Sequence, residues 1–287
     1  MSPNSLENPF HISQLNQESP AHLMKTHLPS AEAQALTEAL GEDEPSKSEP
    51  QQDLPPVLDI SMSGKEQKEV EKEPLWIKED YIKWAESFGK DEAWVNETFK
   101  FQPDGTTVVE EDLLLRGTKI EQLPIGLIEV TGKLIVDNNP SLKLNGYPKR
   151  VGENFYCQLN DLSSLQGMPE EVRGFIGFDK SNLSSLVGLP RKVTGGLFLS
   201  NNQLENLDGI SKEVSEDLSF TENNQLTSLE ALRGIKIGGD LFLKDIPATE
   251  IPEEIQISGV ISIREHQTTL AADARAKGYR VRVEINK

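Results

Sequence analysis

The chain has little of what would tie it to a disulfide framework, a membrane or a nucleic acid. Its 287 residues include one cysteine, Cys157, so no internal disulfide can form. No stretch approaches the roughly 18 apolar residues needed to span a bilayer, which predicts no membrane insertion. Acidic residues outnumber basic ones by 47 to 29, and the net charge of -18 disfavours binding to DNA, RNA or an anionic membrane surface. We therefore expect any partner to be another protein or a peptide.

The N-terminus also lacks the pattern of a secretory leader. The stretch MSPNSLENPFHISQL has no basic start followed by an apolar run, and no small-residue cleavage site. A single cysteine fits a reducing compartment. These features predict a cytoplasmic protein, with export by a route that needs no signal peptide as the alternative that stays open.

Residues 1–74 are poor in aromatic side chains and rich in Pro, Ser, Gln and Glu. The first 75 residues contain 14 acidic and 5 basic side chains. Such a segment cannot bury enough apolar surface to offset the entropy lost on ordering. The composition predicts a disordered acidic tail.

The composition changes abruptly after the tail, and residues 75–108 carry all three tryptophans of the protein, at positions 76, 84 and 94. Tyr81, Trp84, Ala85 and Phe88 follow helical spacing, and Gly89 would end that helix before a second short one. Large aromatics beside a repeat array most simply cover its open end. We expect residues 75–108 to form a helical N-terminal cap.

Residues 109–266 repeat one pattern eight times. Two aliphatic or aromatic residues separated by one position recur at intervals of 21 residues over five successive steps, then 23 and 20. The pairs are Leu113/Leu115, Leu134/Val136, Phe155/Cys157, Ile176/Phe178, Leu197/Leu199, Leu218/Phe220, Leu241/Leu243 and Ile261/Ile263. A valine or isoleucine lies four positions before each pair. Three positions after it stand Thr118, Asn139, Asn160, Ser181, Asn202, Asn223, Ile246 and His266.

The pattern predicts a solenoid. An apolar-x-apolar alternation is a half-buried strand whose outer residues share one face. With 21 residues per unit there is no room for a full crossover helix, so the strands must stack as a parallel sheet along one side of a coil. The asparagine after each strand would turn inward and bond to backbone groups that the sheet leaves bare.

These repeats resemble the leucine-rich repeat family, in particular the short bacterial kind that reads L-x-L-x-x-N-x-L-x-x-L-P. The resemblance implies an α/β-type repeat solenoid, a right-handed coil with a parallel sheet of about eight short strands. It also implies a binding scaffold, since the family serves to bind other molecules. Ile246 and His266 depart from the pattern. Residues 267–287 suggest a closing C-terminal cap, with a helix from about Thr268 to Lys277 and a strand through Val281, Val283 and Ile285.

The middle residue of each alternation points to the open face of the sheet. Five of these eight residues are large and apolar: Leu114, Ile135, Tyr156, Phe198 and Phe242. Phe175 flanks them, and charged residues lie on both sides. An apolar stripe with a charged rim has the anatomy of a protein-binding patch. Two alternatives stay open, namely strand propensity alone and covering of the stripe by the chain's own N-terminal tail.

The sequence offers no catalytic, metal or cofactor site. Cys157 takes an inward strand position, the histidines lack metal-site spacing, and the acidic runs flank turns. We expect a non-enzymatic leucine-rich repeat protein that binds a partner through the apolar stripe, with delivery as a bacterial effector as an extension. One alternative is a recognition subunit of a ligase or other enzyme complex whose catalysis lies on another chain. A further alternative is a structural or self-associating role through the sheet face and its edges.

Overall fold

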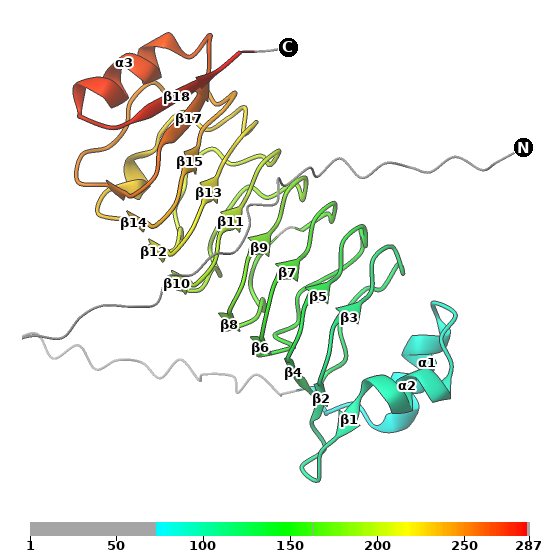
Figure 1. Ribbon diagram of the computed structural model, residues 1–287. Coiled ribbons are helices and arrows are strands. Elements are labelled where there is room, and N and C mark those ends of the chain that lie inside the picture. Colours follow the sequence, from blue (N-terminus) through cyan, green and yellow to red (C-terminus); the bar gives the residue numbers. More distant parts are fainter. Residues whose placement is uncertain (1–72, 163, 286–287) are drawn as a thin grey trace, which may run out of the picture. The chain divides into compact units, whose positions relative to one another are not determined.

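The computed structural model describes residues 73–162 and 164–285, and within them the chain forms a parallel-strand β-solenoid of about eight turns (Figure 1). Each strand pairs with its equivalent in the next turn, so that Leu113 lies opposite Leu134 and Leu134 opposite Phe155. This is the register that the 21-residue spacing predicts. The predicted tail, residues 1–74, lies outside the described residues except for its last two positions.

The apolar-x-apolar alternations form the longer of the sheets. Its nine strands follow the order β18-β17-β15-β13-β11-β9-β7-β5-β3. The bounds are β3 Leu113–Leu114, β5 Leu134–Ile135, β7 Phe155–Tyr156, β9 Ile176–Gly177, β11 Leu197–Phe198, β13 Leu218–Ser219, β15 Leu241–Phe242, β17 Ile261–Arg264 and β18 Val281–Glu284. All eight predicted strands are present, and β18 from the C-terminal segment adds a ninth.

The valine column that precedes each alternation forms further strands, which the sequence did not predict. One sheet has the order β1-β2-β4-β6-β8, and another has the order β10-β12-β14-β16. Their bounds are β1 Lys100–Phe101, β2 Thr107–Val109, β4 Leu127–Val130, β6 Arg150–Val151, β8 Glu171–Val172, β10 Lys192–Val193, β12 Glu213–Val214, β14 Lys236–Ile237 and β16 Gln256–Ile257. Both rows are parallel except for the β1–β2 hairpin. The two sheets follow one another along the solenoid, but β8, the last strand of the first, does not pair with β10, the first strand of the second.

The interior holds the outer residues of every alternation and a ladder of amides. Leu197, Leu199 and Cys157 are fully buried. Asn202 is also buried, and its amide nitrogen donates to the carbonyl oxygens of Phe178 at 2.9 Å and Leu199 at 3.0 Å. Side chains of this kind satisfy backbone groups that short strands leave unpaired. The predicted inward position of the asparagines is therefore confirmed.

The last step of the ladder departs from the sequence alignment. His266 takes the ladder position in the repeat, yet its side chain is 57% exposed. The neighbouring Gln267 is buried instead, and its amide nitrogen donates to the carbonyls of Leu243 at 2.9 Å and Ile246 at 3.0 Å. Gln267 lies one position later than the other ladder residues, and its longer side chain still reaches these carbonyl groups. Earlier in this irregular region, the 23-residue turn contains the 3-10 helix η1 (Glu230–Leu232).

Two helices and a hairpin lie at the first turn. The helices α1 (Lys78–Glu86) and α2 (Glu92–Thr98) agree with the aromatic spacing, and Gly89 lies between them. Their aromatic side chains stack edge to face, with ring centroids 4.8 Å apart for Trp84 and Phe88 and 5.0 Å for Tyr81 and Phe99. The hairpin of β1 and β2 follows, and its two-residue first strand gave no signal in the sequence.

The C-terminal segment forms the predicted helix and strand. The helix α3 (Thr268–Ala276) buries Leu270, Ala271 and Ala274 against the core. Gly278 follows with φ of 85°, a conformation that favours glycine at the end of a helix. The chain then enters β18, which pairs in parallel with β17. Figure 1 shows α3 beside β17 and β18 at this end of the solenoid.

Candidate protein-binding face

The predicted stripe residues form one column across the nine-stranded sheet. The strand register places Leu114 opposite Ile135 and Ile135 opposite Tyr156, and it continues across the sheet to Arg282, which the sequence did not assign to this face. The full column is Leu114, Ile135, Tyr156, Gly177, Phe198, Ser219, Phe242, Ser262 and Arg282. Phe175 lies in the flanking column.

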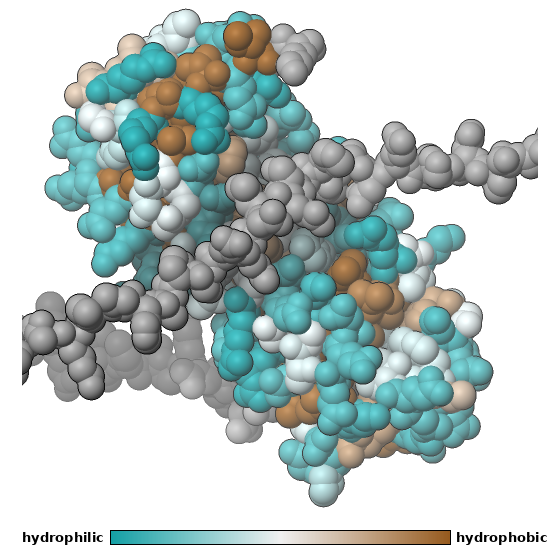
Figure 2. Space-filling view, in the orientation of Figure 1, coloured by the Kyte–Doolittle hydropathy of each residue, from teal (hydrophilic) through white to brown (hydrophobic). Residues whose placement is uncertain are grey.

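The exposure of these side chains divides the stripe into separate patches. Leu114 is 59% exposed, whereas Ile135, Tyr156, Phe175, Phe198 and Phe242 are half-buried. The small residues Gly177, Ser219 and Ser262 are buried between them. Figure 2 shows apolar residues in separate patches among polar ones on the side in view. The predicted stripe residues therefore form separate apolar patches on this face, divided by small buried residues.

Neighbouring side chains close over the small residues. A Cβ atom placed on Gly177 would lie 3.0 Å from Nε2 of Gln158 and 3.4 Å from the Tyr156 ring. Gly177 thus allows Tyr156 and Gln158 to pack across it. Tyr156 is further fixed because its hydroxyl oxygen accepts a hydrogen bond from Nδ2 of Asn154 at 3.0 Å.

Phe175 and Phe198 form an aromatic pair at the centre of the face. Their ring centroids are 5.7 Å apart with an interplanar angle of 59°. Gly196 lies beneath both rings, since a Cβ atom there would come within 2.9 Å of Phe175 and 3.1 Å of Phe198. The glycine is therefore required for this close packing. Sequence reasoning identified both phenylalanines but gave no role to Gly196.

Two aspartates sit on one flank of the column with different surroundings. Asp137 is buried, and its carboxylate pairs with Nη2 of Arg116 at 2.8 Å. Asp179 accepts hydrogen bonds from the backbone amide of Ser200 at 2.6 Å and from Nε2 of Gln158 at 3.2 Å. Within the described part of the chain no basic side chain pairs with Asp179. Burial raises the pKa of Asp179, although its hydrogen bonds to Ser200 lower it in part.

On the opposite flank, carboxylates and an amide bridge successive turns. The side chain of Asp112 accepts from the amide of Lys133 at 2.7 Å, and that of Asn154 accepts from the amide of Phe175 at 2.9 Å. Asp217 and Asp240 repeat this contact. The sequence suggested only a charged rim here. The structure gives these residues the further role of pairing backbone groups between turns.

The C-terminal part of the face is held by ion pairs. Nζ of Lys244 lies 2.8 Å from the carboxylate of Glu284 and 5.4 Å from the centroid of the Phe242 ring. Arg264 contacts Glu284 at 3.8 Å and Asp245 at 3.1 Å. Phe242 is consequently partly covered by a cation, unlike the Phe175–Phe198 pair.

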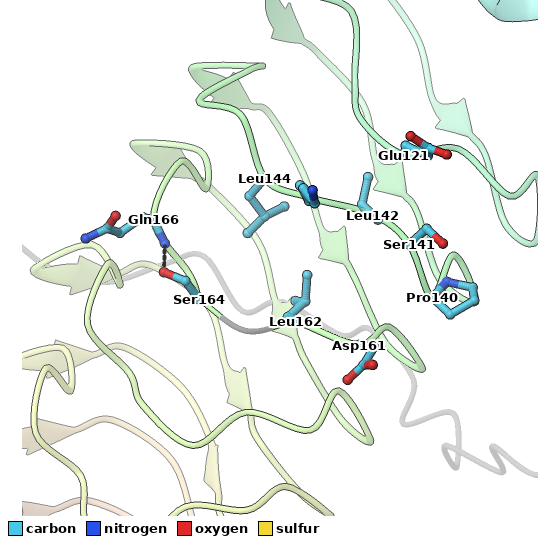
Figure 3. A pocket seen from close by; sticks show the side chains of 10 residues that line it. Glu121, Pro140, Ser141, Leu142, Leu144, Asp161, Leu162, Ser164 and Gln166 are labelled. Carbon is cyan, nitrogen blue, oxygen red and sulfur yellow. Dashed lines mark hydrogen bonds between the residues drawn. The ribbon is translucent and has the colours of Figure 1, made fainter. Parts of the chain in front are cut away.

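Elsewhere in the described residues, the side chains that could act as nucleophiles, bases or metal ligands do not come together in one site. Cys157 is completely buried, and burial raises the pKa of its thiol to about 12, so it carries no thiolate at neutral pH. No three potential metal ligands gather in the described ranges. A hollow open to solvent lies between successive turns, lined by Glu121, Leu142, Leu144, Asp161, Leu162 and Gln166 among others (Figure 3). It presents a backbone–hydroxyl contact between Gln166 and Ser164 but no nucleophile beside a base.

No helix in residues 73–162 or 164–285 has the length and apolar character needed to cross a membrane. No protein-family model, curated protein or solved structure matches the chain.

Proposed function

We propose that this chain is a leucine-rich repeat protein that binds another protein through the open face of its nine-stranded sheet and carries out no catalysis itself. The leucine-rich repeat assignment is supported by the 21-residue register and by inward asparagines that bond across turns, such as Asn202. In this proposal α1 and α2 act as the N-terminal cap, because their aromatic rings cover the first turn of the core.

The observation that carries the binding proposal is the centre of the face, where Phe175 and Phe198 stack and Asp179 lies on the flank beyond Gly177, the strand partner of Phe198. The two rings form an apolar surface that is accessible in part. Asp179 is a carboxylate whose burial disfavours its charge, and within the described residues it accepts hydrogen bonds but forms no ion pair with a basic side chain, although the charge of Lys180 offsets part of the burial. A cationic group from outside would relieve that cost while the rings remove apolar surface from water.

The expected partner is therefore a protein segment that presents an aliphatic or aromatic side chain next to Arg or Lys. The apolar side chain would pack on Phe175 and Phe198, and the base would pair with Asp179. Arginine suits the position best, because its guanidinium can stack on an aromatic ring and donate to a carboxylate together. The net charge of -18 would also attract such a segment at long range.

The proposal is tested by screening the full chain against a displayed library of random peptides. We expect enriched peptides to combine an apolar residue with Arg or Lys, and we expect Phe198→Ser to weaken their binding by about tenfold or more, because central aromatic residues dominate such contacts. Ile77→Ser is the matched control, because Ile77 is 62% exposed and lies outside the face. Peptides without a basic residue, or peptides that bind both variants equally, would contradict the proposal.

Asp179→Asn separates the two contributions. It keeps the size of the side chain and removes its charge, so it should abolish the preference for basic peptides while leaving the apolar preference in place. An unchanged preference for Arg and Lys would show that Asp179 is not the group that recognises them.

A further inference from the structure

The strand β18 ends the nine-stranded sheet and leaves one set of backbone groups without a neighbouring strand. The amide of Ile261 donates to the carbonyl of Arg280 at 2.8 Å, and the amide of Glu265 donates to that of Glu284 at 3.2 Å. Even-numbered residues of this segment therefore face β17. The backbone groups of Val281, Val283 and Ile285 point the other way, toward an edge that no described strand occupies.

Two of the features that usually prevent pairing are absent from this edge. It lacks proline, and its odd-numbered side chains are apolar rather than charged. Val283 is 39% exposed and Ile285 is 71% exposed, which places both among the most exposed large apolar residues of the described chain. Figure 1 shows β18 at the end of the row of strands.

We propose that β18 pairs with β18 of a second copy of this chain, antiparallel, about a two-fold axis at Val283. In that register Val283 lies opposite its own equivalent, and Val281 lies opposite Ile285 of the second copy. All of these residues have outward-pointing backbone groups, so they form the hydrogen-bonded pairs that an antiparallel ladder requires. A register shifted by one residue would place an outward-pointing group opposite an inward-pointing one.

The side chains in this register are complementary as well. Arg282 and Glu284 both project to the open face, and the two-fold axis places Arg282 opposite Glu284 of the second copy, twice over. They form non-hydrogen-bonded pairs, in which cross-strand side chains approach most closely. Within one chain, Glu284 already contacts Lys244 at 2.8 Å and Arg282 contacts Asp240 at 3.2 Å. The second copy would extend these pairs into one network.

A second copy is favoured over other occupants because the strand matches itself in both charge and polarity. The sequence Val-Arg-Val-Glu-Ile gives opposite charges at the two even positions and apolar side chains at the three odd ones. This pairing uses the end of the sheet and does not depend on the proposed function of the Phe175–Phe198 centre.

The test is sedimentation velocity of the full chain over the widest concentration range that its solubility permits, with single variants at the charged positions. Arg282→Glu and Glu284→Arg should each raise the dimer dissociation constant by about tenfold or more, because symmetry replaces two attractive pairs by two repulsive ones. An equimolar mixture of the two variants should form a heterodimer, in which every opposing pair again has opposite charges. Weakened association without recovery in the mixture would overturn the proposed register.

Val283→Pro provides an arm that leaves Arg282 and Glu284 intact. It removes an outward-pointing amide, which proline tolerates at a sheet edge, and should abolish the dimer while thermal unfolding shows a folded chain. Leu114→Ser is the matched control at the opposite edge of the sheet, where the side chain is 59% exposed. Loss of association in this control would point to head-to-tail stacking instead. A monomer at every concentration, or association of a folded Val283→Pro variant, would overturn the proposal.

Discussion

Among single residues, Asp179 is one whose negative charge at neutral pH lowers the stability of the folded chain, because its carboxyl group is partly buried. Burial raises the pKa of its carboxyl group above the value in the unfolded chain, so the folded protein binds this proton more tightly. The stabilisation from that proton is fully present below the ordinary aspartate pKa of about 4 and is lost as the pH rises through the folded-state value. At neutral pH the charged group is a cost to folding.

We therefore expect Asp179→Asn to increase the free energy of unfolding at pH 7, with the gain disappearing below about pH 4. Asparagine can still accept from the amide of Ser200, which lies 2.6 Å from the carboxylate oxygen. Urea unfolding at the two pH values measures the difference. Asp137→Asn is the control, since Asp137 has Arg116 at 2.8 Å and should gain nothing from neutralisation. A less stable Asp179→Asn variant at pH 7 would mean that charged hydrogen bonds outweigh the cost of burial.

The polar residues on the flank of the face could be placed from the sequence only in part. Alternation within a strand fixes which side a residue points to, so Phe198 and Tyr156 could be placed on the open face. It does not say whether a polar side chain bonds to the next turn. A signal for that role exists, because the flanking Asp or Asn is followed in the next turn by glycine. Gly132 meets Asp112 in this way, with the carboxylate oxygen 2.4 Å from where a Cβ would stand.

Among elements, α1 and α2 depend on aromatic packing more than on helix length. At 9 and 7 residues both are too short to be stable alone in water. Trp84 contacts the rings of Trp76, Phe88, Trp94 and Phe99, and its indole nitrogen donates to the carbonyl of Gln122 at 3.2 Å. This side chain joins both helices to the first turn of the solenoid.

Replacing Trp84 with alanine should therefore lower the free energy of unfolding by about 3 kcal/mol, the low end for removal of a large aromatic because the residue is half-buried. Denaturant unfolding followed by far-UV circular dichroism measures the loss. Ile77→Ala is the matched control on the same segment, and at 62% exposure it should change stability by about 0.5 kcal/mol or less. Equal effects of the two substitutions would show that the ring cluster does not anchor the helices.

The helices and the C-terminal strand could be predicted because each has a strong period in a long enough window. The β1–β2 hairpin could not, since Lys100–Phe101 is too short to show alternation. The prediction for the last ladder position was wrong for another reason. Alignment by spacing selects His266, whereas β17 continues to Arg264 and shifts the inward position to Gln267. The equivalent strand β15 ends after two residues, whereas β17 has four, and the buried ladder side chain falls one position later than the spacing predicts.

Across the described part of the molecule, each turn contacts mainly its neighbours, so stability depends on the contacts between adjacent turns. The nine-stranded sheet is continuous from β3 to β18. The shorter strands that precede it are divided into two sheets, because β8 and β10 do not pair. Val172 and Val193 both fit the repeat and are both buried, so nothing in their spacing predicts the gap. At this point the hydroxyl of Thr194 donates to the carbonyl of Val172 at 2.9 Å.

Thr194→Val should consequently weaken the coupling between the two parts of the solenoid. We expect a loss of about 1 kcal/mol in unfolding free energy from the missing hydrogen bond. We also expect separation of two unfolding curves: fluorescence, which reports the tryptophans at positions 76, 84 and 94, and circular dichroism, which reports the whole chain. Thr131→Val is the matched control at the equivalent position. Its hydroxyl also bonds to the preceding turn, but its backbone amide donates to Val109 at 2.9 Å and would keep the turns joined. Coincident curves for Thr194→Val would show that the nine-stranded sheet and the amide ladder alone make the solenoid unfold as one unit.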